Sequence, residues 1–111
     1  MKKDILKSLQ ELIVPVSKGW DIIDFSIDEK KEEVHVHLRY NLSFYKDGTH
    51  SYILYDIRPS RTWRHLDLWQ YKTYIHAEVP RIKLEDGTVK SINVPWSEPH
   101  SRITDLFEKK L

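Results

Sequence analysis

The chain has 111 residues, a formal net charge of +1 and no cysteine. This length accommodates one domain with a modest core and excludes a large enzyme scaffold. The lack of cysteine excludes disulfides and thiolate zinc sites, and the small net charge means that any nucleic-acid-binding face depends on an uneven distribution of charge.

Composition and the N-terminal residues predict a cytoplasmic protein. Hydrophobic residues make up 40% of the chain and charged residues 32%, as in ordinary globular domains. The opening MKKDILKSLQ has no apolar core of a signal peptide, and no apolar run is long enough to span a membrane. We therefore expect a single domain over residues 1–111 with no membrane association.

Helical patterns stand at the two ends of the chain. Residues 1–14 predict a short amphipathic helix, because Ile5, Leu9 and Leu12 recur at helical spacing before Pro15. Residues 101–110 predict a closing helix with Ser101 as its cap.

The region between them, residues 20–97, predicts β-structure. Alternating apolar and polar residues over 20–27 and 34–40 indicate a hairpin around the acidic turn 28–33. Two Asp-Gly pairs, at 47–48 and 86–87, are typical of tight turns. Further strands are expected at the following ranges: 50–57, 62–69, 70–79 and 89–95. The predicted fold is α+β, a small antiparallel sheet flanked by an N-terminal and a C-terminal helix.

Aromatic and basic residues alternate from Asp56 to Pro80, whereas the segment from Asp24 to Glu33 is acidic. Rings that stack and cations that bind phosphate are the components of a nucleic-acid surface. Strand alternation places Arg64 on the face opposite Trp63, which favours Trp63 as a core residue. The candidate DNA-binding residues are Arg58, Arg61, Arg64, Trp69, Lys72, Tyr74, Arg81 and Lys83. The simpler interpretation is a twisted strand pair with aromatic cross-strand contacts and a solvated charged face.

Histidines offer two further candidates. His35 and His37 share one face of a strand and could supply two imidazoles to Zn²⁺, but the sequence identifies no further ligands, so an exposed polar face is favoured. His65 and Asp67 could form a catalytic dyad, but no nucleophile stands beside them, and a hydrogen-bonded structural pair is favoured. We expect no catalysis, no metal and no cofactor.

Four motifs in the second half of the chain resemble a known family. They are WRHLD at 63–67, VPR at 79–81, VPW at 94–96 and LFE at 106–108. In this order they are similar to the N-terminal zinc-finger region of bacterial insertion-sequence transposases of the ISL-three type. In that family two cysteine knuckles hold a structural zinc. Here the Asp-Gly turns stand in their places, which implies a degenerate, metal-free zinc-ribbon-like finger in which Tyr45 and Leu84 pack where ligands would bind.

The resemblance implies an accessory, non-catalytic role in transposition. The domain would contact the DNA ends of the insertion sequence and dock onto a separately encoded catalytic chain. A different interpretation is a protein-interaction domain, or an inactive transposase remnant, that does not bind DNA. Its contact surface would include exposed aromatic residues and Leu106 and Phe107 near the chain end.

If Asp-Gly turns replace zinc knuckles, metal removal will leave the fold unchanged. We expect a chelator to leave the melting temperature unaltered and elemental analysis to find no stoichiometric zinc. A melting temperature that falls with chelator and recovers with added zinc would contradict the turn-replacement hypothesis.

Overall fold

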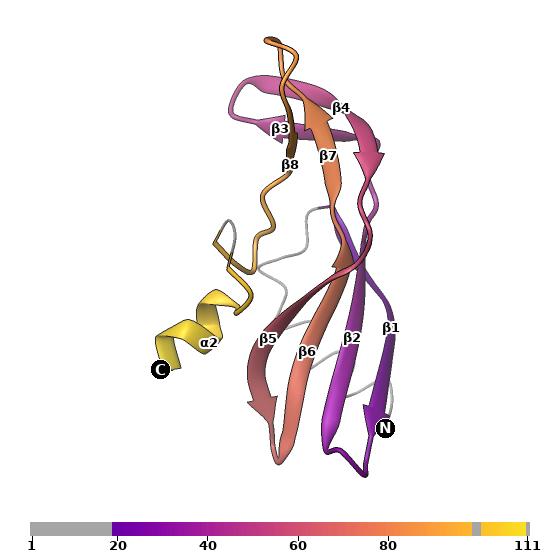
Figure 1. Cartoon of the computed structure of the whole chain (residues 1–111), viewed down its shortest axis with the longest axis vertical. Helices are drawn as coiled ribbons and strands as arrows, with labels where there is room; N and C mark the ends of the chain where they lie inside the picture. Colours follow the sequence, from indigo (N-terminus) through magenta and orange to yellow (C-terminus); the bar gives the residue numbers. More distant parts are fainter. Residues whose placement is uncertain (1–18, 99–100, 111) are drawn as a thin grey trace.

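The computed structural model describes residues 19–98 and 101–110. Eight strands and a six-residue helix are described: β1 (Trp20–Asp28), β2 (Glu33–Tyr40), β3 (Phe44–Asp47), β4 (His50–Ile57), β5 (Arg61–Leu68), β6 (Tyr71–Glu78), β7 (Pro80–Lys83), β8 (Val89–Ser91) and α2 (Asp105–Lys110). The strands form two four-stranded sheets that follow one another along the long axis of the molecule (Figure 1).

Sheet 1 has the strand order β1-β2-β6-β5. Two antiparallel hairpins, β1–β2 and β5–β6, meet along a parallel β2–β6 pairing that aligns Val36 with Ile75 and His37 with His76. Alternating side chains put Val34, Val36 and Leu38 on the buried face of this sheet, as the sequence pattern predicts.

Sheet 2 has the strand order β3-β4-β7-β8. Both Asp-Gly pairs lie at its turns, where Gly48 and Gly87 adopt positive φ angles of 63° and 87°. The chain passes between the sheets from β2 to β3, from β4 to β5 and from β6 to β7. Three residues separate β4 from β5, and a single residue, Val79, separates β6 from β7. The Arg58 amide donates a hydrogen bond to the Val79 carbonyl (3.2 Å) and joins the β4–β5 connection to the β6–β7 connection.

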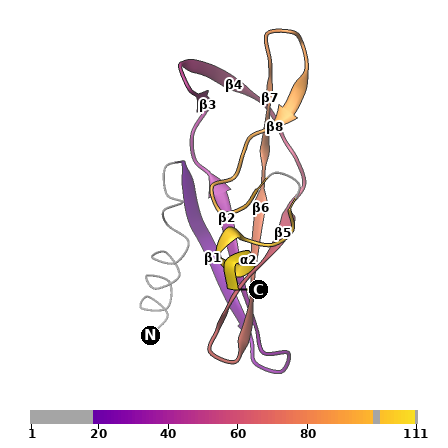
Figure 2. The same ribbon diagram turned by 90° about the vertical axis from the view of Figure 1, so that its left-hand side faces the viewer.

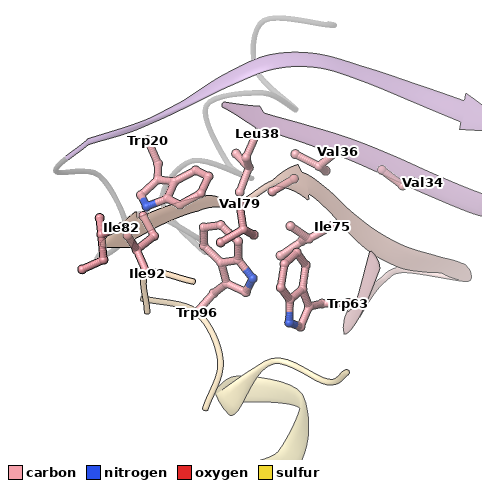
Figure 3. Close-up of a cluster of buried hydrophobic side chains, with 11 residues drawn as sticks. Trp20, Val34, Val36, Leu38, Trp63, Ile75, Val79, Ile82, Ile92 and Trp96 are labelled. Atoms are coloured by element: carbon pink, nitrogen blue, oxygen red, sulfur yellow. The ribbon is translucent and has the colours of Figure 1, made fainter. Parts of the chain in front are cut away.

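The core lies between the buried face of sheet 1 and the segment that follows β8 (Figure 3). Trp96 in that segment makes edge-to-face contacts with Trp20 (ring centroids 4.8 Å apart) and with Trp63 (5.3 Å). Ile75, Val79 and Ile82 complete the cluster and are fully buried. The prediction that Trp63 belongs to the core is confirmed.

The predicted fold class is wrong. The strands form two sheets, and one of the sheets contains a parallel pair, so the chain is not a single antiparallel zinc-ribbon-like sheet. The sequence pattern cannot reveal this pairing, because β2 and β6 are distant in the chain and each has the same alternation whichever neighbour it meets. Nor is the sheet framed by two helices as expected: the structure is dominated by strands, and the predicted helix over residues 1–14 lies outside the described residues.

The C-terminal helix is shorter than predicted. The Arg64 amide donates to the Arg102 carbonyl (2.8 Å) and the Thr104 amide donates to the Arg64 carbonyl (2.9 Å), so the chain at Ile103 extends the edge of β5 instead of coiling. Thr104, not Ser101, caps α2, because its hydroxyl accepts a hydrogen bond from the Phe107 amide (3.3 Å). The resulting short helix packs beside β5 (Figures 1 and 2).

Tyr45 and Leu84 are partly buried and pack against the core. In the part of the chain that the structure describes, no helix has the length and apolar character needed to cross a membrane.

The same substitution is expected to lower stability by different amounts at a buried and at an exposed isoleucine. Ile75 is fully buried and Ile53 is 83% exposed. We expect Ile75→Ala to lower the free energy of unfolding by about 2–4 kcal/mol, since it leaves a cavity. Ile53→Ala, the matched control, will lower it by less than about 1 kcal/mol. Urea denaturation of both variants checks this, and equal losses would contradict the assigned core.

Candidate functional site

The outer face of sheet 1 carries a hydrogen-bonded chain of polar side chains that runs from β2 across β6 to β5. His35 and His76 are joined between Nδ1 and Nε2 (2.7 Å), and the ends of the chain are the Glu33 carboxylate (3.1 Å from His35 Nε2) and the Thr62 hydroxyl (2.8 Å from His76 Nδ1). One set of tautomers satisfies every contact: Thr62 donates to His76, His76 donates to His35, and His35 donates to Glu33. We call these four residues the histidine chain.

Flat side chains stack along the histidine chain. The His76 ring lies between His37 (centroids 4.8 Å apart) and His35 (5.0 Å), and His35 also stacks on Tyr74 (5.3 Å). Burial, together with the positive charge that His37 and His35 would carry, lowers the pKa of His76. The stack therefore favours the neutral form of His76.

The two metal candidates, His35 and His37, do lie on one face, but His76 is placed between them. Across residues 19–98 and 101–110, no three histidine, aspartate or glutamate side chains are grouped to hold a metal ion. The contacts that the histidine chain makes are those of a hydrogen-bonded network.

His65 does not pair with Asp67. A register shift between His65 and Leu68 interrupts strand alternation, and the Asp67 carboxylate instead accepts a hydrogen bond from Arg64. His65 is buried, and its Nδ1 lies 2.6 Å from the Thr104 hydroxyl, while its Nε2 has no hydrogen-bond partner. Burial, assisted by the Arg64 charge, lowers the pKa of His65 to about 4. His65 thus fixes α2 against β5 as a neutral group.

The eight candidate DNA-binding residues do not form one surface. Arg64, Lys72 and Tyr74 lie on the outer face of sheet 1, and Trp69, 76% exposed, occupies the β5–β6 turn at that sheet's far end. Arg58 follows β4, and the remaining three, Arg61, Arg81 and Lys83, are on β5 and β7.

Carboxylates interrupt the cations on sheet 1. Lys72 stands opposite Glu33, and Arg39 stands opposite Glu78 in the register of β2 and β6. Arg64 is engaged by Asp67 and lies over the rings of Tyr74 (5.5 Å) and Phe107 (4.9 Å). This face is accordingly poorly suited to a phosphate backbone.

Sheet 2 has an uncovered apolar face. Four apolar side chains of β3 and β4 are 37–83% exposed, and we call them the apolar stripe: Phe44, Ile53, Tyr55 and Ile57. Phe44 stands opposite Ile53 in the β3–β4 register, and exposed and half-buried residues alternate along β4. A register shift between Leu54 and Asp56 in the β4–β7 pairing sets Ile57 opposite Pro80, at the border of the face that carries Phe44 and Ile53. Large exposed side chains in one row mark an interaction surface.

Cations border the apolar stripe. Lys46 shares the face of Phe44 on β3, and Arg81 lies over the Tyr55 ring (5.7 Å). The Arg81 guanidinium forms a two-point ion pair with Asp56, and its hydrogen bond holds the pKa of that carboxyl below its usual range. Lys83, two residues beyond Arg81 on the same strand, is exposed.

An aromatic cavity of about 580 Å³ opens at one end of the apolar stripe. Its lining includes Trp20, Tyr40, Tyr45 and, from the stripe itself, Phe44. The Tyr40 hydroxyl donates to the Phe44 carbonyl (2.6 Å), which holds the start of β3 against this wall. Phe44 thus belongs both to the stripe and to the wall of the cavity.

The apolar stripe was missed at the level of sequence. The segment YILYDI at 52–57 is apolar on both faces of β4, which was a signal for a strand that needs cover on both sides. Comparisons with known protein families, with characterised proteins and with solved structures found no match. The transposase resemblance rests on the sequence motifs.

The lowered pKa of His65 makes stability depend on pH. The unfolded chain binds a proton at His65 near pH 6.5, whereas the folded chain binds it only near pH 4. Stability is therefore unaffected above pH 6.5 and falls as the pH drops through this window, by up to about 3 kcal/mol. Urea denaturation at neutral pH and in this window, for the wild type and His65→Asn, isolates the contribution. An NMR titration of His65 with a midpoint near 6.5 would contradict it.

Proposed function

We propose that this protein is a non-catalytic docking domain that binds a segment of another protein across the outer face of sheet 2. The observation that carries the proposal is the apolar stripe, in which Ile53 is 83%, Ile57 58% and Tyr55 55% exposed. Aliphatic side chains at such exposure offer nothing to a phosphate backbone, but they are the natural contacts of a protein partner.

Charge and shape define the chemistry of the partner. Lys46, Arg81 and Lys83 border the stripe, and Asp56, the carboxylate beside them, is already paired with Arg81. A partner segment that presents apolar side chains flanked by carboxylates complements this face. One of its side chains would enter the aromatic cavity beside Phe44 and act as an anchor.

The sequence resemblance suggests a biological setting for this docking. In an insertion-sequence transposase the partner would be the separately encoded catalytic chain, and the domain would act in the cytoplasm as its accessory subunit. Contact with the DNA ends belongs to the same setting. The cations that border the stripe, with Arg58 beyond β4, are the candidate residues that this face offers for such contact.

The docking proposal is tested with labelled peptides in fluorescence anisotropy. Two synthetic probes, one helical and one extended, carry leucine on one face and glutamate on the other, and a third replaces glutamate with lysine. We expect an acidic probe to bind and the lysine probe to bind far more weakly. Ile53→Ser/Ile57→Ser will weaken binding by about tenfold or more, since two buried side chains are lost.

The matched control is Ile23→Ser/Ile27→Ser, which removes two exposed isoleucines of β1 on sheet 1. It will leave peptide binding unchanged. A labelled DNA duplex is titrated in parallel at low and moderate salt. No binding of either acidic peptide would overturn the docking proposal. Duplex binding that survives Ile53→Ser/Ile57→Ser and is lost on Arg58→Ala/Lys83→Ala would overturn it in favour of DNA contact.

A further inference from the structure

A second cavity, of about 560 Å³, lies between β5 and the segment that leads from β8 toward α2. Figure 1 shows this segment descending beside β5 from sheet 2 to the helix. Asn93 and Val94 line both this cavity and the aromatic cavity. The second cavity is separate from the apolar stripe.

Three cations from three segments line this cavity. They are Arg61 on β5, Lys90 on β8 and Arg102 ahead of α2. A single carboxylate, Glu98, lines it with them, so the lining carries an excess of two positive charges among the described residues. Cations gathered from separate segments around a concave site focus positive potential on a bound anion.

Hydrogen bonds hold these segments in place. The Arg61 guanidinium donates to the Ser91 hydroxyl (2.9 Å) and ties β5 to β8. The Arg64 amide donates to the Arg102 carbonyl (2.8 Å), which keeps Arg102 next to β5. The Ile92 amide donates to the Pro80 carbonyl (3.0 Å). These bonds hold together the backbone segments that carry the three cations.

The remaining lining suits a ligand with both an anionic and an apolar part. Trp63, Ile92 and Val94 supply an apolar wall, while Ser91, Asn93 and Ser101 supply neutral polar groups. A phosphate group attached to a sugar or a base has this combination, and arginine matches its oxygens with paired N–H donors.

We propose that this cavity binds a phosphate group of a phosphorylated ligand, with Arg61, Lys90 and Arg102 as its cationic contacts. The phosphate would come from a free nucleotide or from the backbone of DNA. The site uses none of the stripe residues, so it goes beyond the proposed docking function and does not depend on it.

The test uses the full chain with three probes: inorganic phosphate, adenosine monophosphate and a labelled DNA duplex. Binding is followed by calorimetry for the small probes and by anisotropy for the duplex. Lys90→Gln/Arg102→Gln, which spares the Arg61–Ser91 contact, is the main variant, and Arg61→Gln is the second. The control, Lys31→Gln/Arg39→Gln, removes two exposed cations, one in the β1–β2 turn and one on β2.

We expect the main variant to weaken binding of at least one probe about tenfold, with the control unchanged. Adenosine monophosphate binding identifies a nucleotide site, and duplex binding alone identifies the DNA backbone. No binding of any probe, or binding that the control weakens as much as the main variant, overturns the proposal. Acidic-peptide binding remains intact in the cavity variants, so failure here is distinct from failure of docking.

Discussion

The edge-to-face contacts of Trp96 with Trp20 and Trp63 are the interaction on which the rest of this structure depends. They hold the segment after β8 against sheet 1. Burial of these three indole rings contributes more to the stability of the fold than any single hydrogen bond does. Trp20 also lines the aromatic cavity and Trp63 the cationic one. The same buried tryptophan cluster therefore supplies part of the wall of each cavity.

Sheet 1 holds its histidines in two different environments. His65 is buried as a neutral group, and its pKa is low because burial removes water from the imidazole and the Arg64 charge opposes protonation. His35 and His76 instead share a hydrogen bond on the outer face, and the Glu33 carboxylate lies at one end of their chain. The network crosses the parallel β2–β6 junction, so it helps to specify how the two hairpins of the sheet align.

The surfaces of the two sheets differ in how charged and apolar side chains are distributed. Sheet 1 mixes cations with carboxylates at opposing positions, as Lys72 with Glu33. The outer face of sheet 2 combines exposed apolar residues with cations, and the second cavity gathers further cations behind β5. The two proposed ligands, a protein segment and a phosphate group, therefore meet different parts of this domain.

The sequence by itself determined most strands, the Asp-Gly turns and the burial of Trp63, because alternation and turn chemistry are local properties. It predicted the opposite faces of Arg64 and Trp63 for the same reason. Only the tertiary structure decided that β2 pairs with β6, that Ile103 extends the edge of β5 and that Asp67 bonds to Arg64 instead of His65. Arg61, Lys90 and Arg102 likewise met through folding. These contacts form between strand edges and side chains that are distant in the sequence. Which of them form is set by the free energy of the whole folded chain, and a local sequence pattern does not contain that information.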